Sequence, residues 1–168
     1  MVGLMVAMIE ALKLCMQALP NIELTSFLLI LFTLHFGRLT AFAVPVFILI
    51  EGAVYGFGLW WVMYLYAWPL LSLFVRAFSR VDSAFFWAFV SGVFGLLFGL
   101  LCAVPYFFIG AAGGGAAAGL RQMLAWWVAG IPYDLLHGAG NFALMLALYR
   151  PISSLLRHIR QITGRSPS

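Results

Sequence analysis

The feature that most constrains this chain is the length of its uncharged apolar runs. Between Arg38 and Arg76 the only charged residue is Glu51, and the stretch 84–109 contains none. A helix needs about 20 apolar residues to cross the hydrocarbon core of a bilayer. Only 8% of the 168 residues are charged, against roughly a quarter in a soluble domain. We therefore predict an integral membrane protein.

The apolar runs are continuous rather than alternating, which favours helices over a transmembrane barrel. We predict an all-α bundle of six transmembrane helices that forms a single membrane domain over residues 1–168. Turn residues and cations separate most of the runs. The predicted spans are 2–19, 22–36, 39–58, 59–78, 84–109 and 123–149, with a small-residue loop at 110–119 and a basic tail at 150–168.

The arginines predict the orientation of the bundle. With six spans, both termini share one side of the membrane with the connections after the second and fourth spans. The positive-inside rule places that side in the cytoplasm, because it holds most of the cations. The net charge of +4 therefore indicates membrane topology rather than nucleic-acid binding. The cations on this side are Arg38, Arg76, Arg80, Arg150, Arg157, Arg160 and Arg165.

Burying a polar side chain at membrane depth costs free energy, so such a residue is expected to have a structural or functional role. Asp134, His137 and Asn141 are spaced i, i+3, i+7 and share one helix face. A carboxylate, an imidazole and an amide together offer the donors and acceptors that bind a polar heterocycle. The same side chains would also suit helix packing, by pairing with one another or with Glu51. The sequence leaves both interpretations open.

Other candidate binding residues lie near the predicted outer ends of the spans. The aromatic rings among them form either an interfacial belt or a stacking wall for a planar ligand. Glu23 is either solvated or part of a connection that closes over a pocket. These candidates are Asn21, Glu23, Glu51, Tyr55, Trp60, Tyr64 and Tyr106.

Small residues mark two helix faces. Ala7 and Ala11 form a small-xxx-small pair in the first span, and such pairs let helices approach closely. A face of Gly92, Gly95 and Gly99 in the fifth span is expected to pack inside the bundle.

Motifs for catalysis and nucleotide binding are missing from the sequence. The glycine-rich stretch 110–119 lacks the Lys-Ser or Lys-Thr of a P-loop, so ATP-driven work would need another subunit. Cys15 and Cys102 lie in apolar runs without metal-ligand spacing, so we expect no metal, no cofactor and no catalytic residue. The alternative is a membrane-embedded enzyme that uses Asp134 and His137 as an acid–base pair.

Three segments, LPNIE at 19–23, EGAVYGFG at 51–58 and GIPYDLLHGAGNF at 130–142, resemble the substrate-binding S components of energy-coupling factor (ECF) vitamin transporters. The resemblance covers nearly the whole chain in span order. It implies six helices with cytoplasmic termini in the plasma membrane of a prokaryote, and high-affinity binding of a micronutrient from outside.

The resemblance also implies roles for residues. Asn21 and Glu23 would form a lid, and Ala7 and Ala11 would match the family's AxxxA contact with a transmembrane coupling subunit, although Glu10 beside them departs from an apolar face. Two cytoplasmic ATPases would complete the importer. The pocket candidates are Tyr55, Trp60, Tyr64, Tyr106, Asp134, His137 and Asn141.

The substrate class follows from the charges available. The predicted outer side has no cluster of arginines or lysines to hold a phosphate or a dicarboxylate. A small planar ring with hydroxyls and a basic nitrogen fits the candidates best. The resemblance favours a vitamin B6 vitamer, namely pyridoxine, pyridoxal or pyridoxamine, with another small vitamin as the alternative.

Overall fold

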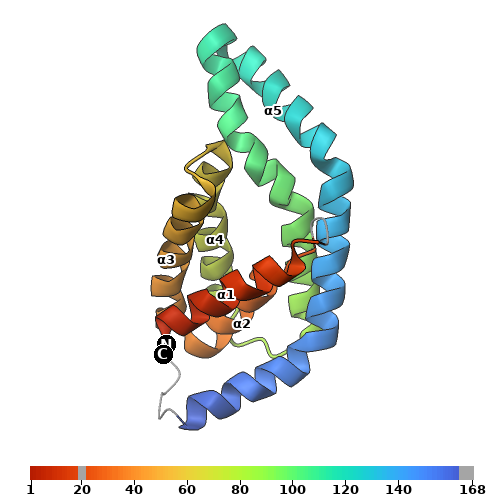
Figure 1. Cartoon of the computed structure of the whole chain (residues 1–168). Helices are drawn as coiled ribbons and strands as arrows, with labels where there is room; N and C mark the ends of the chain where they lie inside the picture. The colour runs from red at the N-terminus through yellow and green to blue at the C-terminus, as the bar shows by residue number, and fades with distance from the viewer. Residues whose placement is uncertain (19–21, 163–168) are drawn as a thin grey trace.

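A computed structural model describes residues 1–18 and 22–162, so Asn21 and Arg165 lie outside the described residues. Short connections join the helices, and no strand occurs in these two ranges (Figure 1). The predicted all-α class is therefore confirmed. The helices are α1 (Val2–Met16), α2 (Thr25–Phe36), α3 (Arg38–Tyr55), α4 (Leu59–Ala77) and α5 (Ala84–Ile162).

The bundle is built around α2. Every residue of α2 except Leu34 is buried, and the helix contacts each of the other four. A helix that is apolar on all sides is buried in a protein core or in a membrane, and here the other helices cover it.

The other helices turn apolar side chains outward. α3, α4 and α5 are long and apolar enough to cross a membrane. Their outer faces expose large apolar side chains such as Phe42, Leu73 and Phe85, which in water would be an aggregation hazard. The helices are therefore those of a membrane protein.

The long helix α5 is a hairpin of two arms, and it corrects our expectation of a loop at 110–119. Only Gly114 and Gly115 depart from helical backbone angles, and Gly115 has a φ of 74°, in the region that favours glycine. The alanines on either side are strong helix formers, so the helix continues to a two-residue reversal. Figure 1 shows this tip projecting beyond the ends of α3 and α4.

The expected tail at 150–168 is also helical as far as Ile162. Figure 1 shows the last part of α5 bending away from the second arm, and the helix contains Pro151, a residue type that kinks helices. Ser153 and Leu156 on this part are buried, and Tyr149 donates a hydrogen bond of 2.9 Å to Asp82 in the connection between α4 and α5. The segment therefore packs against the bundle.

The two arms of α5 meet through glycines, as the small face of the fifth span predicts. A Cβ atom added to Gly95 would lie 2.8 Å from the backbone N and Cα of Gly138. A Cβ atom at Gly138 would in turn lie 3.0 Å from the Gly92 carbonyl oxygen. Backbone cannot yield as a flexible side chain can, so this contact sets the separation of the arms.

We expect Gly95→Ala to destabilise the protein by about 1–3 kcal/mol, because the methyl group forces the arms apart. Thermal unfolding in detergent measures the effect. Gly130→Ala is the matched control, because a Cβ atom there meets nothing within 4 Å. Equal stability of the two variants would contradict the glycine contact.

Candidate functional site

A partly buried ion pair joins α1 to α3. Glu51 is fully buried, and its Oε2 atom accepts a hydrogen bond from Nζ of Lys13. The ammonium group also lies 5.0 Å from the ring centroid of Tyr55 and 5.7 Å from that of Tyr64, within the range of cation–π attraction. One carboxylate and two aromatic rings therefore surround Lys13.

Lys13 is a residue of this site that we did not predict from the sequence. Glu10, three residues earlier on the same helix, is the acid nearest to Lys13 in the sequence. The available signal was that Lys13 is the one cation of the first apolar run, whereas Glu51 is the one charge between Arg38 and Arg76. Opposite charges at membrane depth tend to pair with each other.

A second acid–base contact lies between the α1–α2 connection and α5. Oε1 of Glu23 is 3.7 Å from Nε2 of His137, and Oε2 of Glu23 accepts a hydrogen bond of 3.2 Å from Thr25. Desolvation raises the pKa of the Glu23 carboxyl above its ordinary value, although Lys13 and Thr25 act in the opposite direction. The connection thus brings a carboxyl group against a buried imidazole on another helix.

Aromatic rings link the two contacts. Tyr64 packs on Trp68 with a centroid separation of 5.3 Å, Trp68 on Phe98 at 5.5 Å, and Phe98 edge-on against the His137 ring at 4.8 Å. These rings come from α4 and from both arms of α5. They form a continuous wall from the Lys13 ammonium group to the His137 imidazole.

Three of the predicted residues, Glu23, Glu51 and Tyr64, therefore lie near Lys13, and His137 joins them through its contact with Glu23. We call Lys13, Glu23, Glu51, Tyr64 and His137 the acid–aromatic cluster. Glu23, Glu51 and Tyr64 lie close enough to interact electrostatically. Tyr55 borders the cluster through Lys13 and accepts a hydrogen bond of 3.3 Å from Gln17.

Acceptors outnumber donors in this cluster. Glu10 lies beside Glu51, and Glu23 also interacts electrostatically with Lys13, so three carboxyl groups lie near one ammonium group. Oε1 of Glu51 and Nε2 of His137 are buried and have no hydrogen-bond partner in the described part of the chain. Buried polar atoms normally have a partner, so the cluster suits a ligand that brings N–H donors or a positive charge.

Asp134 and Asn141 have a different environment from His137, although all three share a face of α5. Oδ1 of Asp134 accepts a hydrogen bond of 2.8 Å from the amide of Gly99. Asn141 donates one of 3.3 Å to the carbonyl of Ser91. Both bonds tie the second arm to the first through backbone groups, rather than through the pairing with one another or with Glu51 that the packing interpretation predicts.

The remaining aromatic candidates are farther from the centre. Trp60 lies 5.2 Å from Tyr64 between ring centroids and is 36% exposed, which places it at the rim. Tyr106 stacks on Trp126 at 4.7 Å with an interplanar angle of 22°. Tyr106 therefore belongs to a ring pair between the two arms and has no contact with the cluster among those described.

No protein-family model, curated protein or solved structure matches this chain. Among the described residues, no group of three histidine, cysteine or acidic side chains could hold a metal ion. The acid–aromatic cluster, with its surplus of acceptors, is therefore the main candidate for a binding site.

We expect Lys13→Met to destabilise the protein by about 3–5 kcal/mol, because it leaves the Glu51 carboxylate buried without its partner. The double variant Lys13→Met/Glu51→Leu should recover most of that loss, since apolar pairs often replace buried ion pairs. Unfolding of both variants in detergent measures this coupling.

Gln17→Met is the control on the same helix. Its hydrogen bond to Tyr55 is exposed, so we expect a change of about 0.5 kcal/mol or less. If Lys13→Met cost no more than this control, the ion pair would not support the fold.

Proposed function

We propose that this chain is the substrate-binding S subunit of an ATP-driven ECF-type importer in a prokaryotic plasma membrane. The observation that carries the proposal is the acid–aromatic cluster, a buried site with surplus acceptors and an aromatic wall. It lies beside the α1–α2 connection, which contributes Glu23. We further propose six membrane crossings, with each arm of α5 as one, and cytoplasmic termini.

The orientation has support at the opposite end of the bundle. Arg76, Arg80 and Arg160 come from α4, its following turn and the end of α5, yet they line one cavity. Met1 and Ile159 line a common apolar groove, so the two ends of the described chain lie on the same side. Arginine-rich ends of membrane helices face the cytoplasm.

A vitamin B6 vitamer is the substrate that we propose. Its planar ring would stack on the aromatic wall, and its ring nitrogen or amine would meet the surplus carboxyl groups. Lys13 is the one ammonium group of the cluster and is already paired with Glu51, so little positive charge is left for a phosphate. Another small vitamin with a basic nitrogen is the closest alternative.

Ala7 and Ala11 would contact the coupling subunit. Both are exposed on the face of α1 opposite Met5 and Ile9, which are buried. Glu10, which departs from an apolar contact face, lies beside Glu51 instead. Partner ATPases would hydrolyse the ATP, so this chain would bind and deliver its substrate without chemistry of its own.

Thermal stability in detergent against a panel of water-soluble vitamins tests the binding role. We expect one B6 vitamer to stabilise the protein by about 2.7 kcal/mol at a concentration 100 times its Kd. Glu23→Gln and His137→Ala should lose this stabilisation, whereas Tyr106→Leu should keep it. Absence of a shift with every vitamin would reject the vitamin assignment, and turnover by the purified chain would favour the enzyme.

Uptake in cells tests the partner contact separately. Ala7→Leu should retain vitamin binding by the purified chain but reduce uptake strongly, because the larger side chain blocks close helix approach. Ala129→Leu, at an exposed alanine of α5, should leave both unchanged. Normal uptake by Ala7→Leu would place the coupling subunit on another face.

A further inference from the structure

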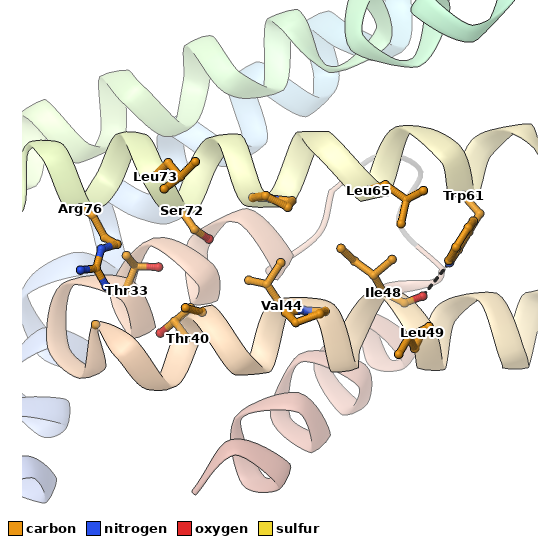
Figure 2. Close-up of a pocket in the computed structure, with 14 residues that line it drawn as sticks. Thr33, Thr40, Val44, Ile48, Leu49, Trp61, Leu65, Ser72, Leu73 and Arg76 are labelled. Atoms are coloured by element: carbon orange, nitrogen blue, oxygen red, sulfur yellow. Dashed lines mark hydrogen bonds between the residues drawn. The ribbon is translucent and has the colours of Figure 1, made fainter.

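A groove of about 490 Å³ runs between α3 and α4 (Figure 2), and none of its lining residues belongs to the acid–aromatic cluster. Its walls are mainly apolar, with Val44 and Ile48 on α3 facing Leu65 on α4. At one end Trp61 closes the groove by donating a hydrogen bond of 2.7 Å to the carbonyl of Ile48. Figure 2 shows Arg76 at the other end.

The groove continues into a polar cavity of about 310 Å³ at the arginine-rich end. The two share Thr33, Gly37 and Arg76 as lining residues. Arg80 lines only the cavity. The nearest acid in sequence, Asp82, accepts a hydrogen bond from Tyr149 and pairs with Arg157 at 3.6 Å.

The charge of the cavity is therefore positive. Of the residues that line it in the described ranges, none is acidic, and Arg76 and Arg80 bring positive charge. An anionic group is the natural occupant of such a site.

Two hydroxyl groups between the apolar and the charged parts have no partner. Thr40 is fully buried and Ser72 is 8% exposed, and neither hydroxyl has a hydrogen bond among the described residues. Both residues line the groove, one from α3 and one from α4 (Figure 2). Buried hydroxyls normally find a partner, so these two suit polar oxygens bound beside the arginines.

The groove opens toward the lipid. Leu49 and Leu73 line it and are 58% and 63% exposed. The stretch from Trp61 to Arg76 on α4 covers roughly 22 Å of helix at 1.5 Å per residue. That length exceeds half of the ~30 Å hydrocarbon core, so it accommodates the acyl chain of a lipid in one leaflet.

We propose that an anionic phospholipid binds here, with its phosphate against Arg76 and Arg80 and an acyl chain along the groove. Thr40 and Ser72 donate hydrogen bonds to the phosphate or glycerol oxygens. The site shares no lining residue with the acid–aromatic cluster, so this inference does not depend on the proposed transport function.

Delipidated protein in detergent tests the proposal, with phosphatidylglycerol, phosphatidylcholine or inorganic phosphate added and thermal stability measured. Phosphatidylglycerol should stabilise the protein at concentrations at which phosphatidylcholine does not. Arg76→Gln/Arg80→Gln should weaken its apparent affinity by roughly tenfold or more, since each arginine attracts an anionic headgroup. Arg121→Gln, a similar loss of charge on the second arm of α5, should leave the affinity unchanged.

Thr40→Val gives a second test, because its effects on stability without lipid and on stabilisation by lipid should have opposite signs. Without lipid it should raise stability, because it removes a buried hydroxyl that lacks a partner. With phosphatidylglycerol the stabilisation should shrink, because a donor to the lipid is lost.

Three results would overturn the proposal. Equal stabilisation by phosphatidylglycerol and phosphatidylcholine would show that the headgroup charge does not contribute to binding. Full stabilisation by inorganic phosphate would indicate a free-anion site without a lipid. A similar loss in Arg121→Gln would reduce the effect to general surface charge.

Discussion

The pairing of Lys13 with Glu51 is the interaction on which the arrangement of the site depends. Neither charge is stable alone at membrane depth, so α1 must lie across α3 where the two side chains meet. This placement sets Lys13 against Tyr55 and Tyr64. It also anchors the helix that precedes the α1–α2 connection, from which Glu23 reaches His137 on α5. Helices distant in sequence are thus joined by polar contacts inside an otherwise apolar bundle.

The close approach of the two arms of α5 is the second constraint. Without side chains at Gly95 and Gly138, backbone packs against backbone, and Asp134 reaches the amide of Gly99. A Cβ atom at Gly99 would collide with that carboxyl group. The same contact leaves His137 beside Phe98 and facing the α1–α2 connection. One helix face therefore serves two purposes, since Asp134 and Asn141 hold the hairpin while His137 belongs to the cluster.

The two sites differ in charge as well as in position. Carboxyl groups are in surplus at the acid–aromatic cluster, which favours a cationic or N–H-bearing ligand. Arginines dominate the polar cavity that adjoins the groove between α3 and α4, which favours binding of an anion. The proposed vitamin and the proposed phospholipid would thus bind at places of opposite electrostatic character. A lipid between α3 and α4 would also cover the hydroxyls of Thr40 and Ser72, which the helices leave without partners.

The sequence by itself determined the membrane character, the all-helical class and the small face of Gly92, Gly95 and Gly99, because these follow from local composition and from the 3.6-residue period. It also identified Glu23, Glu51, Tyr64 and His137 as polar or aromatic residues that needed a role. Only the tertiary structure decided which residues meet. It paired Lys13 with Glu51 rather than with Glu10, and it stacked Tyr106 on Trp126 away from the cluster. The physical reason is that spacing along a helix fixes which side chains share a face, whereas the neighbour that this face meets is fixed by the packing of all the helices together.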